Sequence, residues 1–326
     1  MITTLEISNF KSIKHLKQDC KRINIFIGEP NTGKSNILEA FGLFSFGCYF
    51  SYGSLAAFVR FERTSNLFYD ENLDEVIELK FDNKFLKIRF KDGAFRGECT
   101  EAESRLFEWT GNYSSLDVSI FTDKGREQLS PFKFYRFAVK REFPRPESEF
   151  LLPPSGENLL SLLVTHRELR NTANQLFSNF GLRLGLRPQE NKIEVVKQLE
   201  DIIISYPYSL TSDTLQRLVF YLTAVFSNKN SVLVFEEPES HAFPYYTKYL
   251  AETIALDKRD NQYFISTHNP YFLLPLLAKC PKEDIAITIT YYKDYQTKIK
   301  SLNREDMEEI AEIDVFSNID RFIERQ

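Results

Sequence analysis

The stretch INIFIGEPNTGKSNILEAF, residues 23–41, decides the fold of this chain. It begins with INIFI, an apolar run of the kind that forms a strand buried within a sheet. GEPNTGKS, Gly28 to Ser35, follows with the spacing GxxxxGK(S/T), and after Lys34 the apolar residues recur at helical spacing. The sequence therefore predicts a buried strand, a glycine-containing loop and a helix in immediate succession.

The loop has the chemistry of a phosphate-binding site. Its two glycines let the backbone turn N–H groups inward, and the N-terminus of the following helix favours an anion. The Lys34 side chain can reach the β- and γ-phosphates of a nucleotide, and the Ser35 hydroxyl can coordinate Mg²⁺. The expected nucleotide-binding residues of this segment are Gly28, Glu29, Pro30, Asn31, Thr32, Gly33, Lys34, Ser35 and Asn36.

Two other apolar runs end in polar residues that suit the same site. The run SVLVFEEPESHAFP, residues 231–244, places Glu236 and Glu237 at the end of one strand. The run QYFISTHNP, residues 262–270, places His268 at the end of another. Each feature alone has an ordinary interpretation, as a solvated strand terminus or a structural histidine. In a parallel sheet, however, ligands bind beyond the carboxyl ends of strands, so the features together favour one site. One carboxylate can hold Mg²⁺ while its neighbour orients and deprotonates an attacking water.

The rest of the chain alternates between strand-rich and helical patterns. Residues 75–98 alternate apolar and polar positions between turn dipeptides, which predicts an antiparallel meander, and residues 130–143 form a second strand-rich stretch. Residues 157–204, including VVKQLEDIII, have a helical pattern, and another helix is expected after Ser212. The last third alternates strands and helices, which indicates a parallel-rich sheet covered by helices.

Composition excludes several classes of protein. A hydrophobic fraction of 43% and a net charge of −5 exclude a disordered tail and a basic nucleic-acid coat. The four cysteines are widely spaced, which argues against a zinc site and a disulfide framework. Residues 40–59 carry no charge, but their Gly, Ser and Tyr content favours a buried helix followed by a loop over a membrane span. The N-terminus has no apolar signal core, so we expect a cytoplasmic protein without a membrane partner.

The order NFKSI, GEPNTGKS, FEEPESHAFP and ISTHNP resembles the ABC-type ATPase heads of the SMC/RecF/OLD group, which are also called AAA family ATPases. The resemblance covers residues 1–45 and 205–325. It implies a magnesium-dependent ATPase in which Lys34, Glu237 and His268 are catalytic. In that group the second glutamate is the catalytic base and the histidine senses the γ-phosphate. Ser35 and Glu236, at the Walker B position, are the implied metal ligands.

This resemblance implies the α/β fold of a P-loop NTPase, with a central parallel-rich sheet, an antiparallel β lobe and a helical signature subdomain. We expect a single ATPase head that is divided into four parts along the chain. These are the phosphate-loop segment, residues 1–60; the strand-rich lobe, residues 61–155; the helical signature subdomain, residues 156–230; and the Walker B and switch half of the sheet, residues 231–326.

The signature segment of the group has an unusual form in this chain. The group's LSGGQ or LSDGT pattern corresponds to LTSDTLQR, residues 210–217, so Thr211 and Ser212 are the implied contacts to a partner's nucleotide. Asp213 stands where the second glycine is expected, and its carboxylate would repel a γ-phosphate that it faced. Two other departures are a glutamate in place of the usual Walker B aspartate and the lack of a convincing Q-loop glutamine.

Relatives hold ATP between two heads, so the resemblance implies a homodimer that closes and opens with ATP. We expect such a switch to act in DNA-associated work, in repair or antiphage defence, by driving a partner effector. The alternative is a regulatory module that binds nucleotide without turnover, and a transporter ATPase is the third alternative. No TOPRIM nuclease domain is expected, because the chain ends at Gln326 soon after the switch region.

DNA is a candidate partner through two basic stretches that contain aromatic residues. The competing interpretation is a solvated strand face whose other side carries phenylalanines. The first stretch contains Lys80, Lys84, Lys87, Arg89, Lys91 and Arg96, and the second contains Lys133, Arg136, Lys140, Arg141 and Arg145.

Overall fold

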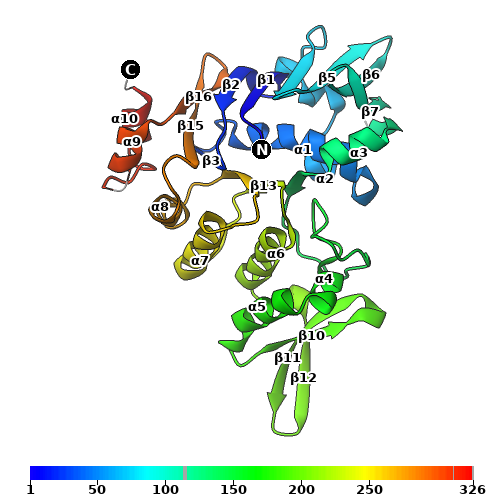
Figure 1. Ribbon diagram of the computed structural model, residues 1–326, viewed down its shortest axis with the longest axis vertical. Helices are drawn as coiled ribbons and strands as arrows, with labels where there is room; N and C mark the ends of the chain where they lie inside the picture. The colour runs from blue at the N-terminus through cyan, green and yellow to red at the C-terminus, as the bar shows by residue number, and fades with distance from the viewer. Residues whose placement is uncertain (113–115, 311, 325–326) are drawn as a thin grey trace.

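The computed structural model describes residues 1–112, 116–310 and 312–324. Its centre is a six-stranded sheet with the order β16-β15-β3-β14-β13-β9 (Figure 1). The five strands from β15 to β9 are parallel, and β16 pairs antiparallel at one edge. The parallel-rich sheet expected from the sequence is therefore confirmed. The strands are β3 (Ile23–Ile27), β9 (Phe132–Tyr135), β13 (Val232–Glu236), β14 (Gln262–Ser266), β15 (Ile285–Lys293) and β16 (Gln296–Ser301).

A second sheet of seven strands is antiparallel throughout and has the order β2-β1-β4-β5-β6-β7-β8. It contains the meander predicted for residues 75–98. The hairpin partner β2 was not predicted, and β7 and β8 lie within the strand-rich lobe expected at residues 61–155 but were not predicted individually. The strands are β1 (Thr4–Phe10), β2 (Ile13–Asp19), β4 (Ile77–Phe81), β5 (Lys84–Lys91), β6 (Ala94–Glu101), β7 (Ser104–Gly111) and β8 (Leu116–Phe121).

Helix α1 (Lys34–Tyr49) lies between the two sheets and is buried on nearly every side. The Phe41 ring stacks on Phe81 of β4 at 4.3 Å and contacts Phe264 of β14 at 4.2 Å, measured between ring centroids. Helix α1, which begins at the phosphate loop, is thus held in place by aromatic packing from both sheets. The uncharged segment ends in α2 (Leu55–Phe58), and within the described residues no helix is long and apolar enough to cross a membrane.

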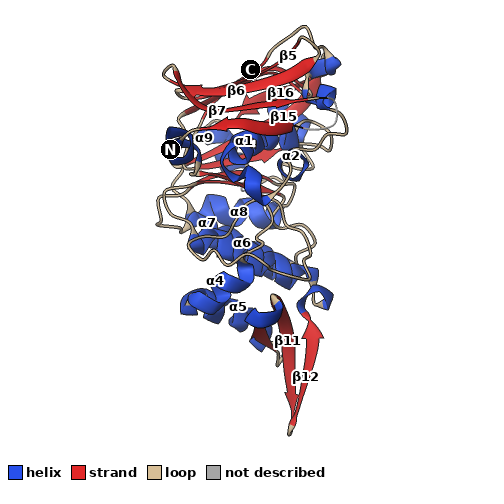
Figure 2. Cartoon of the chain, turned by 90° about the vertical axis from the view of Figure 1, so that its right-hand side faces the viewer, coloured by secondary structure: helices blue, strands red, loops and turns tan. Residues whose placement is uncertain are grey.

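The other face of the central sheet is covered by helices that lie below it in Figure 1 and form a layer of their own in Figure 2. Alternate residues of each central strand point to opposite faces. Thus Phe264 packs with α1 whereas its neighbour Ile265 packs in the cluster of the lower helices. This burial on both faces explains the continuous apolar runs. The lower helices are α6 (Asp213–Ser227), α7 (Pro244–Ala255) and α8 (Pro270–Lys279).

The helical prediction for residues 157–204 is only half correct. Helices α4 (Leu159–Thr165) and α5 (Arg167–Ser178) are present, but the rest forms a three-stranded antiparallel sheet that projects from the head (Figures 1 and 2). The stretch VVKQLEDIII is a hairpin, because its β-branched residues favour strands and Glu200-Asp201 makes the turn. The strands are β10 (Arg183–Arg187), β11 (Lys192–Leu199) and β12 (Ile202–Pro207).

The strand prediction for residues 130–143 is also too long, because only the four residues of β9 form a strand. Beyond it, the Arg136 N–H donates to the Pro154 carbonyl, and the chain continues irregularly through a proline-containing segment. A proline cannot donate to a strand ladder. The remaining helices are α3 (Asp123–Leu129), α9 (Arg304–Glu309) and α10 (Ile319–Ile323). Short 3₁₀ turns cover Phe50–Tyr52, Thr64–Leu67, Tyr69–Glu71, Pro188–Glu190 and Tyr208–Leu210.

Candidate functional site

The phosphate loop connects the carboxyl end of β3 to the first turn of α1. Gly33 has φ 97°, and a Cβ atom there would lie 2.0 Å from the Thr297 hydroxyl oxygen, so the position requires glycine. The loop is braced from outside by the hairpin of β15 and β16. The Thr32 hydroxyl oxygen of the loop lies 2.7 Å from that of Thr290 on β15. Thr297 on β16 is itself held by Ser12, in the turn between β1 and β2, with the two hydroxyl oxygens 2.6 Å apart.

The Lys34 side chain is folded back over this loop. Its ammonium group donates to the carbonyl oxygens of Gly28 and Glu29, at 2.7 and 2.8 Å. Burial lowers the Lys34 pKa, and the nearby carboxylates of Glu237, Glu236 and Glu29 act in the opposite direction. An anion in the loop would replace the two carbonyl oxygens with stronger, charged acceptors.

Glu237 and His268 are brought together by the pairing of β13 with β14. The Glu237 N–H donates to the Ser266 carbonyl at 3.1 Å, and the Glu237 Oε1 atom lies 3.1 Å from His268 Nδ1. The exposed side-chain fractions are 36% for Glu237 and 59% for His268, so a ligand can reach both. This pair lies at the carboxyl ends of the strands, where parallel sheets bind ligands.

Ser35 and Glu236 are the residues that could hold a divalent metal. Each supplies the hard oxygen atom that Mg²⁺ prefers, and such sites take their other ligands from water and phosphate oxygens. Ser35 lies in the first turn of α1, next to Lys34, whose pKa Glu236 influences. No group of three or more His, Cys, Asp and Glu residues that could form a protein-only metal site occurs in the part of the chain that the structure describes.

A cluster of charges behind Glu236 was missed by the sequence analysis. The fully buried Glu39 carboxylate of α1 pairs with Lys11, with Arg60 at 2.7 Å and with Arg136 at 3.0 Å. The same two arginines also pair with Glu236, at 3.0 and 3.5 Å. We call these five residues the Glu39 cluster. Its members are far apart in the sequence, so only the adjacency of β9 and β13 reveals it.

The signature segment lies at the start of α6. Thr211 donates its hydroxyl to the Tyr208 carbonyl, and Ser212 is an exposed residue at the N-cap position. The Asp213 carboxylate turns back along the helix and accepts from Arg217 at 2.6 Å. Among the described residues, no hydrogen bond or ion pair joins Thr211 or Ser212 to the phosphate loop.

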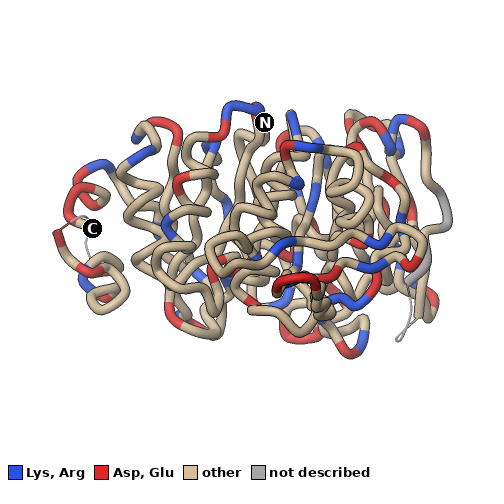
Figure 3. Tube along the Cα trace, turned by 90° about the horizontal axis from the view of Figure 1, so that it is seen from below, with Lys and Arg blue, Asp and Glu red and all other residues tan. Residues whose placement is uncertain are grey.

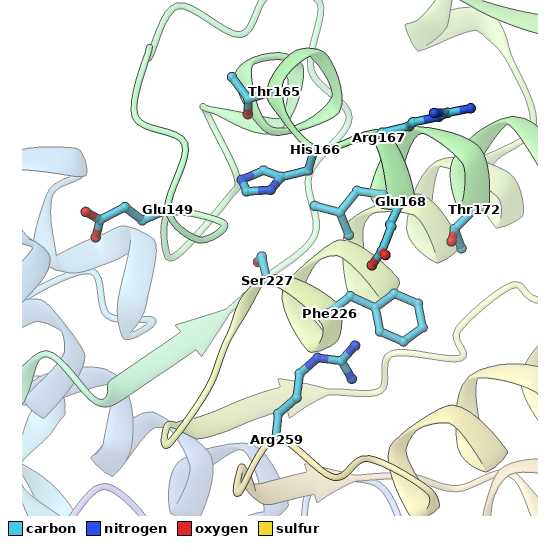
Figure 4. Close-up of a pocket in the computed structure, with 10 residues that line it drawn as sticks. Glu149, Thr165, His166, Arg167, Glu168, Thr172, Phe226, Ser227 and Arg259 are labelled. Atoms are coloured by element: carbon cyan, nitrogen blue, oxygen red, sulfur yellow. The ribbon is translucent and has the colours of Figure 1, made fainter.

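Two hollows are candidate ligand sites. One of about 550 Å³ borders the phosphate loop and is lined by Glu29–Thr32, Thr290–Lys293 and part of α10. The other, of about 420 Å³, lies between the start of α5 and the end of α6 (Figure 4). In the second hollow His166 contacts the Ser148 carbonyl at 2.6 Å, and Arg259 pairs with Asp257 at 3.0 Å. These polar groups are satisfied within the chain, so we assign this hollow no ligand.

The second basic stretch does not form an open cationic surface. Lys133 is buried, which lowers its pKa to about 7, and Arg136 belongs to the Glu39 cluster. Lys140 and Arg145 both pair with Glu157. Most of the first stretch lies on the exposed side of β4 to β6, where glutamates such as Glu98 are interspersed. Lys84 lies on the other face, where it is only 15% exposed and pairs with Glu101 at 2.8 Å. Figure 3 likewise shows basic and acidic residues mixed over the face that it presents.

Two family models match the sequence. A model described as "AAA ATPase domain" matches residues 1–143. A model described as "AAA domain, putative AbiEii toxin, Type IV TA system" matches residues 111–274, half of the chain. Between them the two models cover the phosphate loop, Glu236, Glu237 and His268. Among curated proteins, none matches.

Solved structures of SMC heads have a similar fold. An SmcHead bound to the C-winged helix domain of ScpA is 16% identical to this chain, with a TM-score of 0.54. The match covers 94% of this chain and 99% of that structure's chain. An Smc head with an extended coiled coil, bound to the C-terminal domain of ScpA derived from Pyrococcus furiosus, is 14% identical. Its TM-score is also 0.54, with 95% of this chain and 98% of that chain covered. The chain therefore belongs to the AAA domain family of the second model, and it has the fold of SMC heads.

Proposed function

We propose that this head binds ATP with Mg²⁺ in the phosphate loop and hydrolyses it with Glu237 as the general base. The observation that carries the proposal is the Glu237–His268 pair at 3.1 Å, in which Glu237 lies near enough to Lys34 for its charge to raise the Lys34 pKa. A general base must lie within hydrogen-bonding reach of its water, and His268 contacts only one of the two Glu237 oxygens, so the second can also accept a hydrogen bond from a water. That oxygen now lies 3.3 Å from the Ser240 hydroxyl.

Each residue then has a separate task. Lys34 exchanges the carbonyls of Gly28 and Glu29 for phosphate oxygens, and the backbone N–H groups of the loop bind the same phosphates. Bound Mg²⁺ would neutralise charge on the β- and γ-phosphates, next to Ser35 and Glu236. Glu237 removes a proton from the attacking water, and His268 orients that carboxylate through Nδ1 while its other nitrogen can contact the γ-phosphate.

We propose that two heads share each nucleotide, so that Thr211 and Ser212 contact the ATP held by the partner. Three observations support this arrangement: Ser212 is exposed, it is the N-cap of a helix of 15 residues, and within the described part of the chain no hydrogen bond or ion pair links it to its own phosphate loop. The N–H groups at the start of a helix favour a phosphate. Because Asp213 already pairs with Arg217, its negative charge is partly neutralised and turned away from such a phosphate.

Lys34→Ala should abolish ATP binding and turnover, because no other cation would contact the β- and γ-phosphates from within the loop. Nucleotide affinity is measured by calorimetry and turnover by phosphate release. Lys248→Ala on α7 is the matched control, since that lysine is 61% exposed and pairs loosely with Glu252. Turnover that survives in Lys34→Ala, as it should in the control, would contradict the proposed site.

Mixing two inactive variants tests the shared site. Lys34→Ala and Ser212→Arg should each be inactive alone, because the first lacks the lysine of the phosphate loop and the second lacks the signature contact. In an equal mixture half of the dimers are mixed and each has one intact site, so about a quarter of the wild-type rate should return. A mixture as inactive as its components would show that each chain builds its site alone.

A module that binds ATP without turnover is the second candidate. It is favoured by the two arginines on Glu236, which compete with a metal for that carboxylate. Measured ATP affinity without phosphate release, at any Mg²⁺ concentration, would support this candidate over the ATPase.

The wider role is also a proposal: a cytoplasmic ATP-dependent dimer that drives an effector in DNA repair or antiphage defence. It rests on the family resemblance and on the SMC heads of similar fold, whose structures contain the partner ScpA. ATP turnover measured with and without DNA tests the DNA part. We also propose the four-part division of the chain, with boundaries at residues 60, 155 and 230. Strands β10 to β12 then lie in the helical signature subdomain, and the strand-rich lobe contributes β9 to the central sheet.

A further inference from the structure

Glu239 is a third carboxyl group at the site, in the segment between β13 and α7. It is 2% exposed, whereas Glu236 and Glu237 are only partly buried. Its Oε1 atom accepts a hydrogen bond from the hydroxyl of Thr267, the residue before His268. Its Oε2 atom is buried and has no hydrogen-bond partner among the described residues.

The direction of these hydrogen bonds fixes where a proton on Glu239 must be. The Asn269 N–H donates to the Thr267 hydroxyl oxygen at 3.1 Å, so the single hydroxyl proton of Thr267 is free to point at Glu239. Oε1 is therefore an acceptor in either protonation state. A proton held by this carboxyl group lies on Oε2, the atom without a partner.

The surroundings of Glu239 favour the protonated form. Burial raises its pKa to about 7, and the nearby Glu237 acts in the same direction. Thr267 and the backbone amides of Glu239 and His268 act in the opposite direction. From α6, Tyr221 also faces the group, and burial raises the pKa of that phenol, so it stays neutral.

Glu239 connects the two loops that carry the catalytic pair. The Glu237 N–H donates to the Ser266 carbonyl, which joins the loops at their backbone. The Thr267–Glu239 hydrogen bond joins them again one residue from His268. A shift of either loop would change the 3.1 Å separation of Glu237 and His268.

We propose that Glu239 is a positioning residue that acts as a neutral carboxylic acid and holds the Glu237 loop against the His268 loop through Thr267. Loss of its proton places an uncompensated charge in a dry site beside a second carboxylate. The two loops then separate, and the geometry needed for water attack is lost. This inference rests on the ATPase activity proposed above.

The test compares Glu→Gln substitutions at Glu239 and at its neighbour Glu237. Glu239→Gln keeps a carbonyl oxygen for Thr267 and remains neutral, so it should retain wild-type turnover at about pH 6.5 to within about threefold. The wild-type rate should fall as pH rises through about 7, because Glu239 ionises, whereas the Glu239→Gln rate should stay flat up to about pH 8.5. Glu239→Ala, which cannot hold Thr267, should lose about tenfold or more.

Two outcomes would overturn the proposal. Glu239→Gln as inactive as Glu237→Gln would mean that Glu239 works as a carboxylate, and Glu239→Ala as active as wild type would mean that it positions nothing. Thr267 variants give a second route if Glu239→Ala does not fold. Thr267→Ser should keep activity and Thr267→Val should lose it, and equal activity of the two would contradict the link.

The free energy of unfolding reports on Glu239 without ATP. The folded state holds a proton on Glu239 between the unfolded pKa of 4.5 and the folded pKa of about 7. Wild-type stability should therefore fall as pH rises through this window, and Glu239→Gln should lack that component. If the chain hydrolyses no ATP but this difference is present, the ATPase proposal fails while Glu239 is still shown to be protonated. If the difference is absent, the inference about Glu239 fails.

Discussion

Glu237→Gln should lower the rate of ATP hydrolysis by about 10²–10⁴-fold, the usual contribution of a positioned general base, while ATP binding is retained. The amide keeps the size of the side chain and its contact with His268, but it cannot accept a proton from water. Turnover is measured by phosphate release and binding by calorimetry. Because hydrolysis would normally separate the heads, light scattering should show an ATP-dependent dimer that persists in this variant.

Glu252→Gln on α7 is the matched control for this experiment. Its carboxylate lies 3.9 Å from Lys248 on the helix surface, away from the strand ends, and its turnover should equal that of wild type. An ATP-insensitive monomer in the Glu237→Gln variant would count against the dimer switch. Full turnover in that variant would exclude Glu237 as the base.

Glu39→Gln should destabilise the fold by about 3–5 kcal/mol, because it leaves buried cations without their shared carboxylate. The Glu39 side chain is completely buried, and the side chains of Lys11 and Arg136 are only 11% and 26% exposed. Arg60, at 56% exposed, can turn to solvent, so most of the loss comes from the other two cations. The free energy of unfolding is measured by urea denaturation.

Glu78→Gln provides the control for burial. Glu78 pairs with Lys87 at 2.6 Å, but both side chains are more than half exposed, so the loss should be no more than about 1 kcal/mol. Equal losses for the two variants would show that the Glu39 cluster contributes little to stability. The loss at Glu39 should also release Arg60 and Arg136 from their fixed places beside Glu236.

Local sequence signals were reliable where one stretch of chain supplies all of the determinants. The phosphate loop is the clearest case, since Gly33 must be glycine to avoid Thr297 and the flanking strand and helix follow from apolar spacing. The same signals failed for VVKQLEDIII. Its apolar residues fit both a helical and a strand period, and the projecting hairpin has little packing to distinguish them.

The sequence by itself determined the strand, loop and helix at residues 23–41, the parallel-rich sheet and the acidic and histidine-containing strand ends, because these depend on neighbours along the chain. Only the tertiary structure decided that Lys11, Glu39, Arg60, Arg136 and Glu236 share one buried cluster. It also decided that Glu239 accepts a hydrogen bond from Thr267. Such contacts join separate strands and loops, and their strength depends on burial that no single segment of the sequence encodes.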